Sequence, residues 1–197
     1  MKLAVKINLL FTGIVSCILL GMAVLMFILS KENINRNFKQ QIKTRAGRAA
    51  YFYGRLNNDS TNLLKSLDAN SPPLLLNKNI GIYSEDYKEL YEFHDQNVSA
   101  LQPDTAWLFK AKNNGEYFLT RDKSEIGVFS FENGLLVVVA AENILGTAYI
   151  NDLKRTVIIY FPVAVIVTLL AGYLFSRTMI RPIKQTIHDV KLITSQN

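Results

Sequence analysis

The sequence predicts an α+β fold, in which two long apolar helices flank a domain with a five-stranded antiparallel sheet. Two uncharged stretches, 7–30 and 156–176, predict the helices, because about 20 apolar residues cross a hydrocarbon core of about 30 Å. Between them, apolar residues first recur at helical spacing and then alternate, which indicates strands. The predicted parts are therefore 1–6, a first span (7–30), an intervening domain (31–155), a second span (156–176) and a C-terminal segment (177–197).

The charge distribution argues against a nucleic-acid partner. The formal net charge is +6, but the intervening domain is nearly balanced and the excess lies at the chain ends, at Lys2, Lys6 and in 177–184. Basic residues that flank apolar spans indicate topology. We therefore expect both ends in the cytoplasm and the domain outside. A basic cluster in 31–48 opposes this orientation, although long translocated segments weigh less in the rule.

The first span has three competing interpretations, one of which, a fully buried helix of a soluble protein, is disfavoured by the length of the apolar stretch. A cleaved signal peptide has an apolar region of about 7 to 15 residues, which is shorter than 7–30. Residues 14–17 resemble a lipoprotein cleavage box, but a strongly apolar run after Cys17 would then remain. Cys17 is the only cysteine, which excludes an intrachain disulfide and a thiolate metal cluster.

Small residues recur at every fourth position in both spans. They are Gly13, Cys17 and Gly21 in the first span, and Ala164, Thr168 and Gly172 in the second. Small residues let helix backbones approach closely in lipid, so these positions are predicted packing faces. Chance is the alternative, because small residues are common in membrane helices.

A helix is predicted to continue from the first span through 31–57, with apolar residues at steps of three or four. Polar residues at 57–60 end it, and a short helix at 61–67 precedes Ser71-Pro72-Pro73. We expect the basic face of the long helix to be solvated or to face lipid headgroups.

Five strands and one helix are expected next. The strands lie around 80–83, 90–93, 117–120, 126–131 and 135–141. A helix over 103–112 has Pro103 in its first turn. Asn133-Gly134 predicts a hairpin. Residues 135–141 contain no polar side chain, so this strand is expected to be central and buried on both faces.

The domain contains candidate ligand-binding residues but no catalytic or cofactor motif. The candidate pocket residues are Tyr83, Tyr91, Trp107, Tyr117, Arg121 and Phe129. The alternative is that the aromatic residues serve packing alone. His94 beside Asp95 fits a surface loop better than a metal site, since soft metals need several ligands. We find no catalytic triad or phosphate-binding loop, and we expect no cofactor and no metal.

The C-terminal segment combines a basic collar with a narrow apolar seam. Arg181 and Pro182 follow the second span, and the proline is expected to interrupt the helix. Beyond it, apolar residues fall at Ile183, Ile187, Val190 and Ile193, close to a heptad spacing. We predict that Arg181, Pro182 and this seam relay a signal from the second span.

The run Ser-Arg-Thr-Met-Ile-Arg-Pro-Ile at 176–183, with the seam behind it, resembles the start of a HAMP linker. The whole layout resembles the input half of a bacterial two-component sensor histidine kinase. This resemblance implies a PAS-like external domain, a homodimer in the bacterial cytoplasmic membrane, and signalling to a response regulator only through a kinase module after Asn197. That module would be the enzyme. The run after His188 superficially resembles a phosphoacceptor box, but it continues with Leu192 and Ile193 and lies inside the first HAMP helix.

Two other output classes stay open. Chemoreceptors and membrane-bound cyclases use the same linker, and a non-catalytic scaffold protein is a further alternative. In the scaffold, the seam would dock a partner helix. Lipid and a second copy of the chain are the expected partners in every case.

Overall fold

The computed structural model describes residues 3–55, 75–96 and 98–194, with the backbone alone for residues 3–5, 7, 176, 177 and 179–194. The chain divides into two compact units. One contains residues 1–31 and 149–197, and the other contains residues 32–148. The second unit holds the sheet and is called the external domain below, after its expected position. The predicted features at 57–60, 61–67 and 71–73 lie outside the described residues.

The external domain is built on one antiparallel sheet of five strands, as the sequence predicts. The strands are β1 (Leu76–Tyr83), β2 (Glu89–His94), β3 (Glu116–Arg121), β4 (Ser124–Ser130) and β5 (Leu136–Glu142). Their spatial order is β2-β1-β5-β4-β3. The last strand therefore pairs with both β1 and β4 at the centre of the sheet. All of β5 except its last residue is buried, which confirms the prediction for this apolar run.

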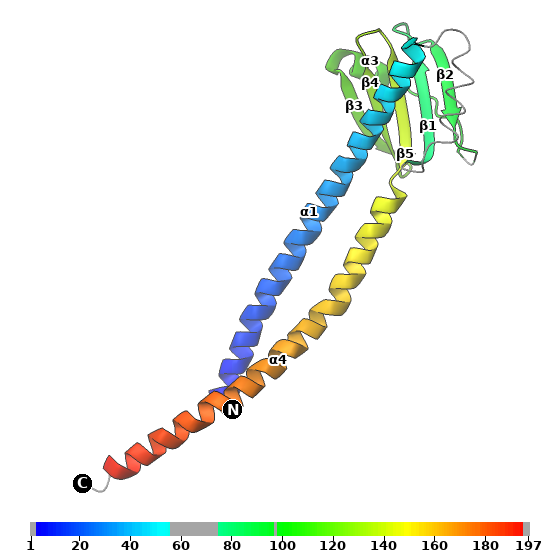
Figure 1. Ribbon diagram of the computed structural model, residues 1–197. Helices are drawn as coiled ribbons and strands as arrows, with labels where there is room; N and C mark the ends of the chain where they lie inside the picture. The colour runs from blue at the N-terminus through cyan, green and yellow to red at the C-terminus, as the bar shows by residue number, and fades with distance from the viewer. Residues whose placement is uncertain (1–2, 56–74, 97, 195–197) are drawn as a thin grey trace. The chain divides into compact units, whose positions relative to one another are not determined.

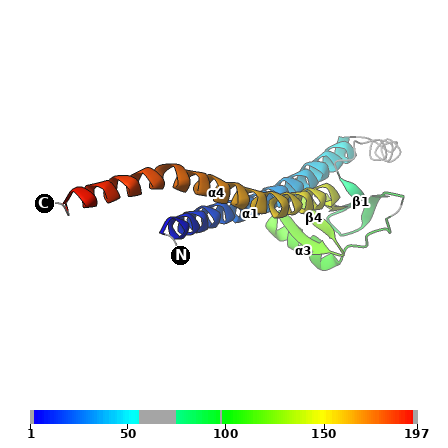
Figure 2. The same cartoon turned by 90° about the horizontal axis from the view of Figure 1, so that it is seen from below.

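One face of the sheet is covered by the C-terminal part of α1 (Leu3–Arg55), as Figures 1 and 2 show. The buried residues of this part recur at steps of three, four and one: Phe38, Ile42, Ala46, Ala49 and Ala50. They pack on Ile80, Ile82, Val137 and Val139 of the central strands. The predicted apolar stripe is thus confirmed at these positions, and small alanines let the helix lie close to the sheet.

The opposite face is covered by α3 (Thr105–Asn114), whose Leu108 and Ala111 join a second core. The helix begins after Pro103, so the prediction that this proline lies in its first turn is wrong. Its N-cap is Asp104, whose carboxylate accepts a hydrogen bond of 2.9 Å from the backbone N–H of Ala106. Gly115 ends the helix at a φ of 81°, a conformation that favours glycine.

Tight turns join the strands. The predicted turn at Asn133-Gly134 links β4 to β5, with Gly134 at a φ of 75° and its N–H bonded to the Phe131 carbonyl at 3.0 Å. Between β3 and β4, a two-residue turn places Asp122 and Lys123 at φ values of 50° and 75°. Neither residue is glycine, so this turn is strained.

The last helix, α4 (Ile144–Thr194), begins directly after β5 with Asn143 as the connecting residue. The Asn143 side chain accepts a hydrogen bond of 3.0 Å from the Gly146 N–H. The predicted interruption at Pro182 is wrong, because the helix continues through it to Thr194. A proline removes one backbone donor, and a long helix tolerates that loss without ending.

Candidate functional site

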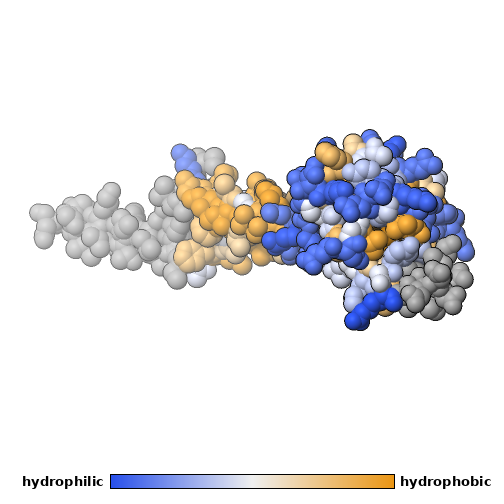
Figure 3. All heavy atoms as spheres, turned by 90° about the horizontal axis from the view of Figure 1, so that it is seen from above, coloured by the Kyte–Doolittle hydropathy of each residue, from blue (hydrophilic) through white to orange (hydrophobic). Residues whose placement is uncertain are grey.

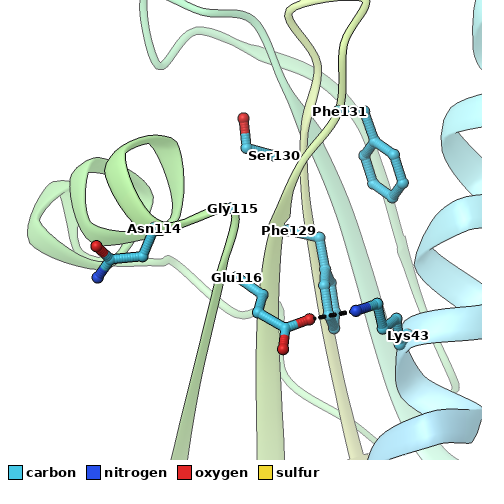
Figure 4. Close-up of a pocket in the computed structure, with 7 residues that line it drawn as sticks. All are labelled: Lys43, Asn114, Gly115, Glu116, Phe129, Ser130 and Phe131. Carbon is cyan, nitrogen blue, oxygen red and sulfur yellow. Dashed lines mark hydrogen bonds and ion pairs between the residues drawn. The ribbon is translucent and has the colours of Figure 1, made fainter.

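A shallow cleft lies beside α1, where the end of α3 meets β3 and β4 (Figure 4). Its volume is about 340 Å³, and it is lined by Lys43, Asn114, Gly115, Glu116, Phe129, Ser130 and Phe131. The Lys43 ammonium lies 2.6 Å from the Glu116 carboxylate and joins α1 to β3. Figure 4 shows this pair beside the Phe129 ring, whereas Asn114 points away from the other labelled side chains. The cleft therefore offers a charged pair and an aromatic wall.

A second hollow of about 540 Å³ surrounds the turn between β4 and β5 and shares Ser130 and Phe131 with the first. Lys112 lies 3.1 Å from Glu85 there. This hydrogen bond is the main cause that raises the pKa of Lys112. Both hollows are open to solvent, and each contains an ion pair. A charged ligand in either hollow would therefore have to replace one partner of that ion pair.

The residues predicted to line one pocket lie on both faces of the sheet. Tyr91 and Phe129 belong to the core beneath α1. Tyr83 belongs to the core beneath α3, where Trp107 and Tyr117 pack against it. Because the sheet separates the two groups, the structure does not bring them together. Phe129 is the member that reaches the cleft of Figure 4.

Arg121, the sixth predicted residue, is exposed at the end of β3. Its guanidinium lies 3.6 Å from the carboxylate of the adjacent Asp122. The sequence prediction placed Arg121 with aromatic residues in a ligand pocket between the sheet and the helix. In the structure it belongs to the turn and lines neither hollow.

Burial changes the acidity of two core tyrosines. Desolvation raises the pKa of both Tyr83 and Tyr91 to about 12. Arg45 on α1 opposes the shift at Tyr91, and burial lowers the pKa of Arg45 itself. Both tyrosines are therefore neutral at physiological pH and act as packing groups with a polar end.

An ion pair that sequence reasoning missed lies at the start of β1. Lys78 is 7% exposed, and its ammonium lies 3.6 Å from the Asp95 carboxylate and 5.5 Å from the centre of the Phe93 ring. Asp95 also accepts a 3.0 Å hydrogen bond from the Lys78 backbone N–H. The available signal is the alternation of Lys78 with Ile80 and Ile82, which places the lysine on the core face.

Both long helices carry a continuous apolar surface. α1 and α4 are long and apolar enough to cross a membrane, and most of their large apolar side chains are exposed. Figure 3 shows this surface in orange, whereas hydrophilic blue covers much of the external domain. A less exposed stripe follows one face of the N-terminal half of α1, at Thr12, Val15, Leu19, Ala23 and Phe27.

A polar contact joins the two helices within their unit. The Asn8 side chain donates a 3.5 Å hydrogen bond to the Leu169 carbonyl. A Cβ atom at Gly172 would collide with Asn8 Oδ1, so the glycine provides the space for this side chain. Thr12, one turn further along α1, is 6% exposed. Its hydroxyl and Asn8 Oδ1 have no hydrogen-bond partner among the described residues.

The predicted small residues fall into two groups. Gly172 contacts Asn8, and Thr168 donates a 2.8 Å hydrogen bond to the Ala164 carbonyl within α4. A Cβ atom added at Gly13 or Gly21 would have no described neighbour within 4 Å, and Cys17 is exposed. Gly13, Cys17 and Gly21 therefore form a face of α1 that is exposed within one chain. This face lies beside the less exposed stripe from Thr12 to Phe27.

The start of α4 lies close to both the end of β5 and α1. β5 passes into α4 through Asn143, with no loop between them. A Cβ atom at Gly146 would lie 2.6 Å from Cγ2 of Ile34, so the start of α4 packs closely on α1 at this point. A single residue therefore separates the central strand of the sheet from the start of α4.

The predicted relay residues Arg181, Pro182, Ile183, Ile187, Val190 and Ile193 have a described backbone, which is helical. Their side chains lie outside the described part, so their seam is a prediction. Within the described residues, no group of three or more His, Cys, Asp or Glu side chains is placed to hold a metal ion. The His94 ring is exposed and contacts the Asp95 carbonyl at 3.3 Å.

Comparison with protein-family models, with curated proteins and with solved structures found no match to this chain.

Proposed function

We propose that this chain is the stimulus-sensing and signal-transmitting half of a membrane receptor of the two-component sensor histidine kinase type. It crosses the bacterial cytoplasmic membrane twice, with the external domain outside the cytoplasm. α1 and α4 supply the spans, and the end of α4 is the start of a HAMP linker. The kinase module that transfers phosphate to a response regulator lies after Asn197.

The connection of one domain to two span-length helices is the observation that carries the proposal. α1 covers one face of the sheet with its last buried turns, and α4 starts at the end of the central strand. A PAS-like domain is supported by the same element order: a long helix, two strands, a helix and three strands. A stimulus that shifts β5 would move the second span against the first.

A homodimer is supported by the open face of the first span. Gly13, Cys17 and Gly21 are exposed, whereas the adjacent stripe from Thr12 to Phe27 is partly covered. Close packing at small residues is a favourable mode of helix association in lipid. We assign the open face to a second copy of the chain.

The experiment uses the protein as its gene encodes it, including everything after Asn197, in isolated membranes. Three glycines inserted between Asn143 and Ile144 break the direct connection of β5 to α4. The matched control inserts three glycines between Asp86 and Tyr87, in the turn that follows Tyr83, which pairs with Leu136 at the opposite end of β5 from Asn143. Autophosphorylation is measured with labelled ATP.

We expect phosphate on a histidine after Asn197, an altered basal level in the first variant, and an unaltered level in the control. A reading frame with no phosphate-transferring module would contradict the kinase assignment. Equal phosphorylation in all three proteins would contradict the coupling through Asn143. A methyl-accepting or cyclase module in its place would select one of the other receptor outputs.

A further inference from the structure

We infer that Lys31 and Lys154 form a site for the phosphate of an anionic phospholipid, at the border between the two spans and the external side. The inference rests on the proposed function, because the border exists only if α1 and α4 cross a membrane. It adds a specific lipid class to the partners of the chain.

One of the two lysines contacts an aromatic ring of the other helix, and the second lies one helical turn beyond that ring in sequence. The Lys154 ammonium of α4 lies 5.8 Å from the centre of the Phe27 ring of α1, within the range of a cation–π contact. Lys31 follows Phe27 by four residues on the same helix and therefore lies on the same face. Side chains of a helix lean toward its N-terminus, which brings the Lys31 ammonium toward the level of Phe27. A second positive charge is thus expected about one helical turn from the ring that Lys154 contacts.

The described residues provide no countercharge for this pair. Both lysines are exposed, and neither forms an ion pair with a described carboxylate. Glu32 and Asp152 are close in sequence and exposed, but they are not within ion-pair distance of either lysine. Like charges on neighbouring helices repel each other, so an anion that contacts both lysines stabilises the arrangement.

The position of the pair identifies the anion. Lys31 directly follows the apolar stretch 7–30, and Lys154 lies two positions before the stretch 156–176, with Arg155 between them. The headgroup layer begins at these positions, and each lipid there presents a phosphate. Basic residues on the translocated side also oppose the usual charge bias of membrane proteins. Attraction to anionic headgroups offsets that disadvantage.

The test compares lipid retention in nanodiscs. The whole chain is reconstituted in phosphatidylcholine alone and in phosphatidylcholine with 30% phosphatidylglycerol as the chosen composition, and bound lipids are counted by native mass spectrometry. The site variant is Lys31→Gln with Lys154→Gln. The control is Lys88→Gln with Lys123→Gln, which removes the same charge from exposed turns of the external domain.

We expect the unaltered chain and the control to retain phosphatidylglycerol preferentially. The site variant should lose that preference by on the order of tenfold, because each lysine near a membrane surface contributes several-fold. Equal retention by all three proteins would overturn the inference, as would an equal loss in the control. Displacement of phosphatidylglycerol by millimolar inorganic phosphate would overturn the assignment to a headgroup and indicate a free-phosphate site.

Failure of the proposed function gives a different result. A chain that does not co-elute with nanodiscs of either composition lacks the two spans, and both ideas are then wrong. A chain that inserts in both compositions but shows no lipid preference leaves the receptor proposal intact and removes the lipid site.

Discussion

At the scale of single residues, the ion pair of Lys78 and Asp95 shows how the external domain accommodates a buried charge. The lysine is 7% exposed, and Asp95 provides both a carboxylate for the ammonium and an acceptor for the backbone N–H. Among the described residues, removal of the acid leaves the buried ammonium beside the Phe93 ring without a countercharge. The net stabilisation by the intact pair is therefore smaller than the destabilisation that follows when one partner is removed and the other charge stays buried.

Asp95→Ala is expected to reduce the free energy of unfolding by about 2 kcal/mol, below the range for fully buried pairs because Asp95 is partly exposed. Urea unfolding followed by the fluorescence of Trp107, the only tryptophan, measures it. Lys78→Met is the control, since an apolar side chain fits the same place and leaves Asp95 partly solvated. An equal decrease in the free energy of unfolding of both variants would show that a buried, unpaired lysine is no more destabilising than loss of the lysine itself.

The buried tyrosines predict a dependence of stability on alkaline pH. The pKa of Tyr83 and of Tyr91 is about 12 in the fold, against about 10 in an unfolded chain. The unfolded state therefore releases these protons first. Their contribution to stability is complete below pH 10 and is lost as the pH rises toward 12.

Ultraviolet titration of the phenol groups should show two late tyrosines. In the variant Tyr83→Phe with Tyr91→Phe, the late phase should disappear and the loss of stability between pH 10 and 12 should be smaller. A single phase near pH 10 in the unaltered protein would contradict the burial of these side chains.

The strained turn at Asp122-Lys123 offers a stabilising change. Lys123 has a φ of 75°, which is unfavourable for a residue with a Cβ atom. Lys123→Gly should raise the free energy of unfolding by roughly 1 kcal/mol. Thermal unfolding measures this, with Lys88→Gly as the control for loss of a lysine side chain. A lower stability for Lys123→Gly would show that the turn has another conformation.

At the scale of elements, the contact of α1 with the sheet depends on a glycine. A Cβ atom at Gly127 of β4 would lie 2.8 Å from Cγ2 of Ile42 and 2.7 Å from the Phe129 ring. The glycine therefore lets the helix lie close to the strand. Ile42 itself is fully buried, so it has little room to move away.

Gly127→Ala should destabilise the external domain by about 2 kcal/mol through overpacking. Gly47→Ala is the matched control, because its new Cβ would lie at an ordinary 3.9 Å from Phe131 and alanine favours a helix. Chemical denaturation should separate the two variants in opposite directions. Equal effects would place α1 further from the sheet than the structure does.

Many of the strands and turns of the external domain could be predicted from the sequence because their signals are local. The apolar run 135–141 indicated a central strand, and Asn133-Gly134 indicated a turn; both are confirmed. The order of strands was not predictable, since β5 pairs with β1 across more than fifty intervening positions and no local pattern encodes that choice.

The candidate site was harder to predict for the same reason. The Lys43–Glu116 pair joins residues 73 positions apart. Aromatic alternation indicated that some of these residues face inward, but it did not show which of the two cores each one enters. The predicted pocket therefore combined residues from both faces. Pro182 was given too much weight as a local signal, because a long helix can accommodate one missing donor.

At the scale of the whole molecule, the open face of the first span should determine self-association. Gly13→Leu with Gly21→Leu places large side chains on a face that is exposed in one chain. We expect energy transfer between labelled copies in bilayers to fall several-fold, with the Trp107 emission unchanged. Met22→Leu with Met26→Leu, on exposed positions of similar size, should leave it unaltered. Undiminished transfer in the glycine variant would assign the dimer contact to another surface.

The central claim is that α1 and α4 cross the membrane with the external domain outside. Single cysteines at Asn113 of α3 and at Thr178 of α4, in a Cys17→Ser background, test it in intact cells with a membrane-impermeant thiol reagent; both positions are exposed. We predict labelling at position 113 and, at position 178, labelling only after the cells are opened. Labelling at position 178 in intact cells, with position 113 protected, would invert the orientation and contradict the receptor proposal.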